Sequence, residues 1–270
     1  MENPIHHYTS INNLALILNS KKIRFNRLDK VDDIKEIDGL TSGFCSYIYI
    51  SCWTDEKEES IPLWKMYTEN MHGVRISFPT KMFKRKLIEA GDRGNHGFTK
   101  EMYSPLSYEE TVTEKYIVTN IFDNEASFFK RVIYDDNYPQ FYKDNFVRTK
   151  EGLMVKNMFS LGAYKKEHWK FQNECRFTLY ANPLLPLNHP LINGSREKQF
   201  AHISDAIINN VINETDFIDV DLNEDILDDI YLKTGPLCND SDKIIVDALL
   251  NKYTKNGSFE LSSLDGTIRK

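Results

Sequence analysis

Residues 168–180 read His-Trp-Lys-Phe-Gln-Asn-Glu-Cys-Arg-Phe-Thr-Leu-Tyr, and the second half of this stretch alternates in polarity. Successive side chains of a strand point to opposite sides, so alternation of period two indicates an extended strand. One face of that strand would carry the apolar side chains Cys175, Phe177 and Leu179. The other face would carry Glu174 and Arg176. The stretch therefore predicts a strand with one face in the core.

The polar face of this strand has two possible meanings. Glu174 and Arg176 are two residues apart, and Gln172 extends the same row. An exposed ion pair of this kind contributes only about 0–1 kcal/mol and would mark an ordinary half-exposed strand. The alternative is that the row lines a functional site. The two interpretations are weighed below by how other segments of the chain relate to this stretch.

The composition is that of an ordinary globular protein. The 270 residues are 41% hydrophobic, 27% charged and 12% aromatic, which allows one large domain or two small ones, with a substantial core. The formal net charge of −6 argues against a protein that coats nucleic acid, because such proteins are normally basic. A local basic groove remains compatible with this charge.

Several kinds of site and location are not supported by the sequence. The four cysteines show no Cys-x-x-Cys spacing, and the seven histidines are scattered, so we expect neither a disulfide scaffold nor a metal site. The first residues show no basic region followed by an apolar run, so we expect no signal peptide. No apolar run approaches the roughly 20 residues needed to cross a bilayer. We therefore expect a cytoplasmic protein without membrane contact.

Strands and helices are mixed along the chain without regular βαβ alternation. Segments 5–9, 23–25, 44–53, 73–78 and 230–232 have strand character. Ser10 can cap a helix with apolar residues at helical spacing. The sequence thus predicts an α+β fold with a split, mostly antiparallel sheet and helical additions.

We expect a single domain over residues 1–256, with a helical section at about 80–166, followed by a polar and frayed tail at 257–270. We also expect the apolar faces of three strands to share one core. These faces are Ile48/Ile50/Cys52, Val74/Ile76/Phe78 and Cys175/Phe177/Leu179.

Taken in order, several short motifs resemble the bacterial family DUF2971. They are His-Tyr-Thr-Ser at 7–10 before an amphipathic helix, Phe25-Asn26 before an acidic loop, Ser51-Cys52-Trp53, Leu-Trp-Lys-Met-Tyr at 63–67, His72-Gly73-Val74, and the Lys, Trp and Glu-Cys-Arg block that ends at 176. The resemblance runs from residue 6 to about residue 250. One departure is an acidic segment usual after the second strand, which is degraded here to Asn26–Glu36.

The layout of this family in turn looks like that of ADP-ribosyltransferases, including DarT-like toxins. Those proteins have a His-x-Thr before an Asn-Leu helix, and His7-Tyr8-Thr9 with Asn13-Leu14 is similar to this element. They also have an aromatic cleft between a strand and a helix. A late Gln/Glu-x-Glu motif carries their catalytic glutamate, and Gln172-Asn173-Glu174 resembles it.

The resemblance implies a chemistry that suits these residue types. Breaking the nicotinamide–ribose bond of NAD builds positive charge on the ribose, which the carboxylate of Glu174 would stabilise while holding a ribose hydroxyl. Tyr67, with Trp53 or Trp64, would stack the flat nicotinamide ring. His7 would hydrogen-bond the ribose on the adenosine side. Glu174, Tyr67 and His7 are then the expected catalytic residues, and we expect them to share one cleft.

The same resemblance implies further binding residues. Arg24 or Arg75 would neutralise the pyrophosphate, because a planar guanidinium fits phosphate oxygens. The remaining expected cofactor contacts are Thr9, Asn13, Ser51, Trp53 and Trp64. Gln172 and Arg176 would contact the substrate, with Gln172 toward the acceptor. No metal is expected.

Each of these residues also has a plain structural interpretation. His7 is also compatible with a satisfied histidine near the core. Trp64 and Tyr67 also suit simple packing, and Arg75 suits a solvated strand position. The alternation of polarity does not separate these possibilities.

The resemblance implies an NAD-dependent ADP-ribosyltransferase that acts as a toxin or phage-defence effector. NAD would be the substrate, and the acceptor would be a protein or a nucleic acid. With water as acceptor, the same cleft would serve an NAD glycohydrolase. The alternative from another class is a non-catalytic sensor module of a defence system, which binds a nucleotide or a partner protein.

Overall fold

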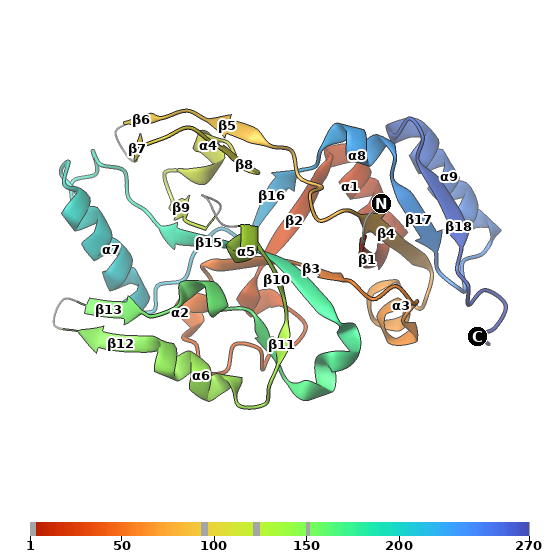
Figure 1. Ribbon diagram of the computed structural model, residues 1–270, viewed down its shortest axis with the longest axis horizontal. Helices are drawn as coiled ribbons and strands as arrows, with labels where there is room; N and C mark the ends of the chain where they lie inside the picture. The colour runs from red at the N-terminus through yellow and green to blue at the C-terminus, as the bar shows by residue number, and fades with distance from the viewer. Residues whose placement is uncertain (1–3, 93–96, 121–124, 150–151, 270) are drawn as a thin grey trace.

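An open, mostly antiparallel sheet runs through the part of the chain that the computed structural model describes, residues 4–92, 97–120, 125–149 and 152–269 (Figure 1). Its strands are β1 (Ile5–Ser10), β2 (Lys22–Arg27), β3 (Ile48–Thr54), β4 (Gly73–Phe78), β9 (Tyr116–Val118), β10 (Phe129–Arg131), β15 (Glu174–Pro183), β16 (Phe217–Asp221), β17 (Tyr231–Thr234) and β18 (Ser258–Leu261). The predicted α+β class and mostly antiparallel sheet are confirmed.

Helices surround this sheet. They are α1 (Ile11–Ser20), α2 (Ser42–Cys45), α3 (Ile61–Tyr67), α4 (Tyr108–Thr111), α5 (Glu125–Phe128), α6 (Tyr138–Asn145), α7 (Arg196–Ile208), α8 (Glu224–Asp228) and α9 (Asp240–Tyr253), with 3-10 turns at Leu28–Lys30, Met158–Ser160 and Glu167–Gln172. As predicted, Ser10 caps α1: its hydroxyl accepts a hydrogen bond from the Asn13 N–H at 3.1 Å.

The sheet opens between β1 and β3. The strand order is β10-β15-β3-β1-β4-β17-β18, and β2 joins β3 to β16. β1 pairs with β4 along its whole length but touches β3 through the single pair His6–Thr54. Past that pair the two strands diverge, because β1 continues beside β4 whereas β3 continues beside β15 and β2. The divergence leaves room for side chains at the centre of the sheet.

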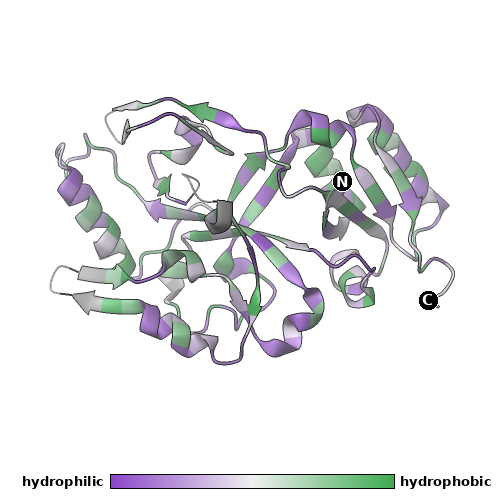
Figure 2. Cartoon of the chain, viewed as in Figure 1, coloured by the Kyte–Doolittle hydropathy of each residue, from purple (hydrophilic) through white to green (hydrophobic). Residues whose placement is uncertain are grey.

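β15 is an inner strand, between β3 and the short strands β9 and β10, and it is buried on both faces, since all ten of its residues are buried. It pairs with β3 over seven residues, from Glu174–Thr54 to Tyr180–Ile48. Arg176 is completely buried. The interpretation of this stretch as a half-exposed strand with a surface ion pair is therefore wrong. Figure 2 shows hydrophilic as well as hydrophobic residues within the central strands.

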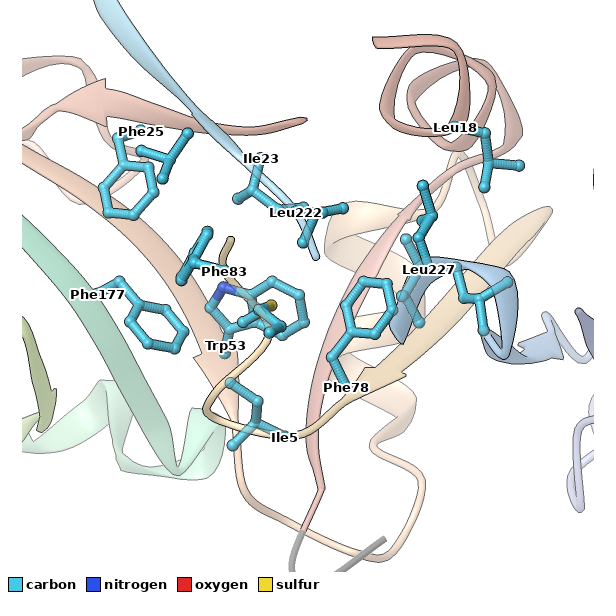
Figure 3. Close-up of a cluster of buried hydrophobic side chains, with 14 of the residues drawn as sticks. Ile5, Leu18, Ile23, Phe25, Trp53, Phe78, Phe83, Phe177, Leu222 and Leu227 are labelled. Atoms are coloured by element: carbon cyan, nitrogen blue, oxygen red, sulfur yellow. The ribbon is translucent and has the colours of Figure 1, made fainter. Parts of the chain in front are cut away.

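Two of the three predicted apolar faces share the main core, and the third does not. Phe177 and Phe78 lie in the main core on either side of Trp53, with ring centroids 6.4 Å and 6.1 Å from it (Figure 3). Ile48 and Ile50 instead lie in a second core on the other side of the sheet. The reason is that β3 is covered on both faces, so its alternation does not reveal which face meets which core.

Among the described residues, the section predicted to be helical at about 80–166 contains paired short strands as well as the short helices α4, α5 and α6. The strand pairs are β5 (Lys86–Ile88) with β8 (Met102–Ser104), β6 (Gly91–Asp92) with β7 (Gly97–Phe98), β11 (Ile133–Tyr134) with β14 (Tyr164–Lys165), and β12 (Phe146–Thr149) with β13 (Gly152–Val155). β12 and β13 pair with each other, which places Phe146 opposite Val155 and Val147 opposite Met154. Such β-branched and aromatic residues favour strands when they pack against a neighbouring strand, and the pattern within one short segment does not show that neighbour.

The tail predicted to be frayed contributes an ordered strand. β18 pairs with β17 in parallel, and the residues that follow it reach Glu59, just before α3. Glu59 accepts hydrogen bonds from Ser263 N–H at 2.8 Å, from Trp64 Nε1 at 3.0 Å and from the Ser262 hydroxyl. One carboxylate thus ties the end of the chain to the start of α3.

Replacing Glu59 with glutamine should change how stability depends on pH. Burial alone would raise the pKa of Glu59, but its hydrogen bonds outweigh burial and lower the pKa to about 2. A carboxylate with a depressed pKa stabilises the fold above its ordinary pKa of about 4.3, and this contribution is lost as the pH falls toward 2. In urea unfolding, the wild type should exceed Glu59→Gln at pH 5, and the difference should shrink steadily toward pH 2. A difference that stays constant over this range would contradict the assignment.

Candidate functional site

A pocket of about 210 Å³ lies where β1 and β3 diverge. Its walls come from β1, β3, α3, the start of β15 and the acidic loop after β2. Five of the residues predicted from the sequence line it, namely His7, Trp53, Tyr67, Gln172 and Glu174. The three expected catalytic residues therefore meet in one pocket although they are far apart in the sequence. Their roles remain predictions.

Glu174 is the first residue of β15. Asn173 before it adopts a left-handed backbone with φ of 40°, which ends the preceding 3-10 turn and starts the strand. The Glu174 side chain is almost completely buried, and its two oxygens accept hydrogen bonds from different cations. Arg176 Nε bonds one oxygen, and Lys165 Nζ lies 2.7 Å from the other.

These residues belong to a buried network of two carboxylates and two cations. Arg176 also binds both oxygens of Glu36, with Nη2 3.0 Å from Oε2, and donates to the Gly162 carbonyl at 2.9 Å. Lys165 Nζ lies 3.7 Å from Glu36. The charges of the four side chains balance, which burial of ions requires.

The network keeps Glu174 ionised. Burial alone would raise the pKa of Glu174, but the positive charges of Arg176 and Lys165 and their hydrogen bonds outweigh it and lower the pKa to about 2. At neutral pH the pocket therefore presents a fixed carboxylate. Both of its oxygens are oriented by side chains that are themselves held in place.

His7 enters the pocket as a neutral imidazole. Its Nδ1 lies 2.9 Å from the Cys52 carbonyl, to which the N–H donates. Burial lowers the pKa of His7, and the hydrogen bond to Cys52 opposes this only in part. In that neutral tautomer Nε2 keeps its lone pair and can accept a proton or a hydrogen bond. The His7 ring lies 5.1 Å from the Trp53 ring, tilted by 40°.

Tyr67 and Gln172 form a chain of hydrogen bonds across the pocket wall. The Gln172 amide nitrogen donates to the Tyr67 hydroxyl at 2.9 Å, and its oxygen accepts from Lys165 at 2.8 Å. Tyr67 donates in turn to Asp32 of the acidic loop. Gln172 is 3% exposed, so both ends of its amide are occupied within the protein.

The other residues predicted for the site do not line the pocket. They are Thr9, Asn13, Arg24, Ser51, Trp64, Arg75 and Arg176. Arg24 is exposed and forms a two-point ion pair with Asp219, at 2.9 and 3.1 Å. Asn13 is exposed on α1, whereas Thr9 is buried.

Four of these outlying residues support the walls of the pocket. The Ser51 hydroxyl accepts a hydrogen bond from Trp53 Nε1 at 3.0 Å. Trp64 is fully buried and packs edge-on against Tyr8, as its structural interpretation predicted. Arg176 is fully buried and supports Glu174 by donating a hydrogen bond from Nε to one of its oxygens. Arg75 is buried beside Tyr8, so its interpretation as a solvated strand residue is wrong.

Sequence reasoning missed Glu36, Lys165 and Asp32. Glu36 stands in the acidic loop whose family pattern is degraded, and Lys165 stands in the section predicted to be helical. Glu36 and Arg176 are 140 positions apart, so no local spacing connects them. The loop's acidity was the one available signal, because a buried arginine elsewhere needs a carboxylate partner.

Two other features of the described residues bear on the kind of site. Among them, no group of three or more His, Cys, Asp or Glu side chains is arranged to hold a metal ion. None of the helices described is long and apolar enough to cross a membrane.

Comparison with known proteins gives one match. Residues 63–177 match the model of a family described as "Protein of unknown function (DUF2971)". The matched segment begins in α3 and ends within β15, so it contains Tyr67 and Glu174 but not His7. No curated protein and no solved structure matches the chain.

Proposed function

Residues 63–177 make this chain a member of the DUF2971 family, and we propose that its pocket transfers ADP-ribose from NAD. The observation that carries the proposal is an ionised carboxylate, Glu174, in a pocket whose other walls include Trp53, Tyr67 and a neutral His7. A fixed carboxylate beside aromatic side chains suits a reaction in which positive charge develops on a sugar ring.

The substrate's charge suits this pocket. The nicotinamide ring of NAD is a cation while it is bonded to ribose, and the faces of Trp53 and Tyr67 attract cations. Glu174 and Asp32 add negative charge at the same pocket. As the C1′–N bond breaks, its electron pair leaves with neutral nicotinamide and the positive charge moves to the ribose. Glu174 would stabilise that charge in the transition state.

The acceptor completes the reaction. A nucleophilic oxygen or nitrogen of the acceptor bonds to C1′, and its proton has to pass to a base. Neutral His7 is suited to take that proton, because Nδ1–H is held by Cys52 and Nε2 is free in this tautomer. Lys165 and Arg176 occupy both oxygens of Glu174, so Glu174 acts electrostatically and not as the base.

The topology also supports comparison with ADP-ribosyltransferases. The expected histidine is on the first strand, the aromatic residue is on α3, and the glutamate begins a late strand beside the opening of the sheet. If the acceptor is water, the same site is an NAD glycohydrolase. A role as a toxin or phage-defence effector would follow from either activity, since both consume cellular NAD.

One observation favours the non-catalytic alternative. The network around Glu174 is neutral as a whole, because Arg176 and Lys165 balance Glu36 and Glu174. A carboxylate that is already paired twice offers less stabilisation to a new cation than a free one. The pocket would then serve a sensor that binds a nucleotide without cleaving it.

The decisive experiment measures nicotinamide release from NAD by the purified protein, with cell extract or nucleic acid added as a source of acceptors. NAD labelled in its adenylate half separates the outcomes: label on a macromolecule indicates transfer, and free labelled ADP-ribose indicates hydrolysis. We expect nicotinamide release with label on a macromolecule. Binding of NAD without release under any of these conditions would contradict the proposal and favour the sensor.

A further inference from the structure

Asp32 is a carboxylate of the pocket lining that forms no ion pair with any described residue. It belongs to the acidic loop after β2 and is exposed, so it lies where the pocket meets solvent. One of its oxygens accepts the Asp33 N–H at 3.0 Å, and the other accepts the Tyr67 hydroxyl. A carboxylate can accept about four hydrogen bonds, so Asp32 keeps capacity for a ligand.

The other formal charges of the lining are compensated. Glu174 and Lys165 belong to the balanced network with Glu36 and Arg176. That network is neutral as a whole, so it attracts a cation in the pocket only weakly. The negative charge that remains for a ligand is that of Asp32.

The imidazoles and the thiol of the lining do not offset this charge. Burial lowers the pKa of His7 and, together with the positive charges of Arg75 and Lys233, lowers the pKa of His6 to about 4. Burial also raises the pKa of the Cys52 thiol well above its ordinary value. All three side chains are therefore neutral at pH 7.

Several hydrogen-bond donors of the lining are already used within the protein. Trp53 Nε1 donates to the Ser51 hydroxyl at 3.0 Å, and the Thr54 hydroxyl donates to the Asn173 carbonyl at 3.1 Å. His7 donates through Nδ1 to a backbone carbonyl at 2.9 Å, which leaves Nε2 as an acceptor. The lining therefore offers acceptors and negative charge, which suit a cationic ligand.

A directed chain of hydrogen bonds ends at Asp32. Lys165 donates to the Gln172 oxygen at 2.8 Å, the Gln172 nitrogen donates to the Tyr67 hydroxyl at 2.9 Å, and that hydroxyl donates to Asp32. An ammonium group only donates and a carboxylate only accepts, so the direction of each bond in the chain is fixed. The chain holds the Asp32 carboxylate beside the aromatic ring of Tyr67.

We propose that Asp32 makes the pocket selective for an aromatic ring cation, which lies against Trp53 and Tyr67 with its charge beside the Asp32 carboxylate. Aromatic faces attract cations, and flat walls suit a flat ring. The pocket volume of about 210 Å³ is below the roughly 300–1,000 Å³ typical of drug-sized ligands, so it suits a single ring. Arg75 adds positive charge from outside the lining, beside Tyr8, which favours the Asp32 wall for a cation.

The identity of this ring as the nicotinamide of NAD rests on the proposed function, whereas the selection of a ring cation does not. The nicotinamide ring is a cation until the C1′–N bond breaks. Asp32 would therefore hold the substrate before the reaction and favour release of neutral nicotinamide after it. A sensor that binds the intact nucleotide would use the same selection.

The test compares two rings of the same shape, 1-methylnicotinamide, which is a cation, and meta-toluamide, which is neutral. Their affinities are measured by NMR titration at low ionic strength for the wild type, Asp32→Asn and the control Asp38→Asn. Asp38 is in the same loop but does not line the pocket, so the control changes the net charge equally. The wild type and the control should favour the cation. Asp32→Asn should lower the ratio of the two affinities about fivefold, the upper range for an exposed ion pair.

Salt provides a second readout, which a purely structural role of Asp32 would not change. Raising the ionic strength from about 0.01 M to about 1 M shortens the screening length from about 30 Å to about 3 Å. The preference of the wild type for the cation should therefore decrease with salt, and that of Asp32→Asn should change much less. The variant is expected to fold, because Asp32 is exposed and asparagine has nearly the same size.

The outcomes separate the two proposals. A wild type that binds the neutral ring as tightly as the cation, or an Asp32→Asn protein that keeps the wild-type ratio, would overturn the selection of a ring cation. So would absence of binding to either ring, or an equal change in Asp38→Asn. If the ratio depends on Asp32 but NAD releases no nicotinamide, the selection stands and the proposed transferase activity fails. If NAD releases nicotinamide but the ratio does not depend on Asp32, the transferase activity stands and the selection fails.

Discussion

Glu174→Gln is expected to slow nicotinamide release from NAD by about 10²–10³-fold, the typical effect of removing one preorganised electrostatic group. Glutamine keeps the shape of the side chain and removes the charge. NAD affinity should change little, because the charge matters mainly in the transition state. The measurement is kcat and KM for nicotinamide release, with NAD binding followed separately by calorimetry.

A matched variant is needed because Glu174 also belongs to the buried network. Glu36→Gln removes the same charge from the same network, at a side chain that does not line the pocket. Its rate loss should be much smaller than that of Glu174→Gln at a temperature where both proteins are folded. Equal activity of Glu174→Gln and the wild type would remove Glu174 from the mechanism, and with it the main reason for the comparison with ADP-ribosyltransferases.

Glu36→Ala is expected to lower the free energy of unfolding by about 3–5 kcal/mol, the usual effect of breaking a buried ion pair. Glu36 and Arg176 are both completely inaccessible to solvent. Alanine would leave the Arg176 guanidinium without its two-point partner and in a protein interior that cannot solvate it. The loss is measured by denaturant unfolding at pH 7.

The matched control for Glu36→Ala is Asp219→Ala. It breaks a two-point pair of the same kind with Arg24, but that arginine side chain is 53% exposed. Exposed pairs contribute about 0–1 kcal/mol, so Asp219→Ala should change stability by no more than this. A loss below about 1 kcal/mol for Glu36→Ala would show that Arg176 finds another partner or water when Glu36 is removed.

The stable, buried network also explains why the pocket holds its shape. Glu36 fixes Arg176, which orients Glu174, while Lys165 connects Glu174 to Gln172 and onward to Tyr67. Each of these contacts joins a different part of the chain. The same residues therefore contribute to stability and to the geometry of the candidate site, and the two paired variants separate these contributions.

Local patterns in the sequence determined much of the secondary structure near the site. Alternation predicted β3, β4 and β15, and the Ser10 cap predicted the start of α1. These features depend on neighbours within a few residues, so they can be read from a short window. The motifs also led to His7, Tyr67 and Glu174, which the structure brings to one pocket.

Only the tertiary structure decided which faces are buried and which charges are paired. The alternation of β15 is the same whether its polar face meets water or a second core, so Arg176 looked like half of a surface pair. Its partner Glu36 comes from a loop 140 positions away, and Lys165 from β14. Likewise, Arg75 is distinguished by the absence of a carboxylate among its described neighbours. Charge compensation in a protein interior depends on which distant segments pack together, and local sequence does not encode that proximity.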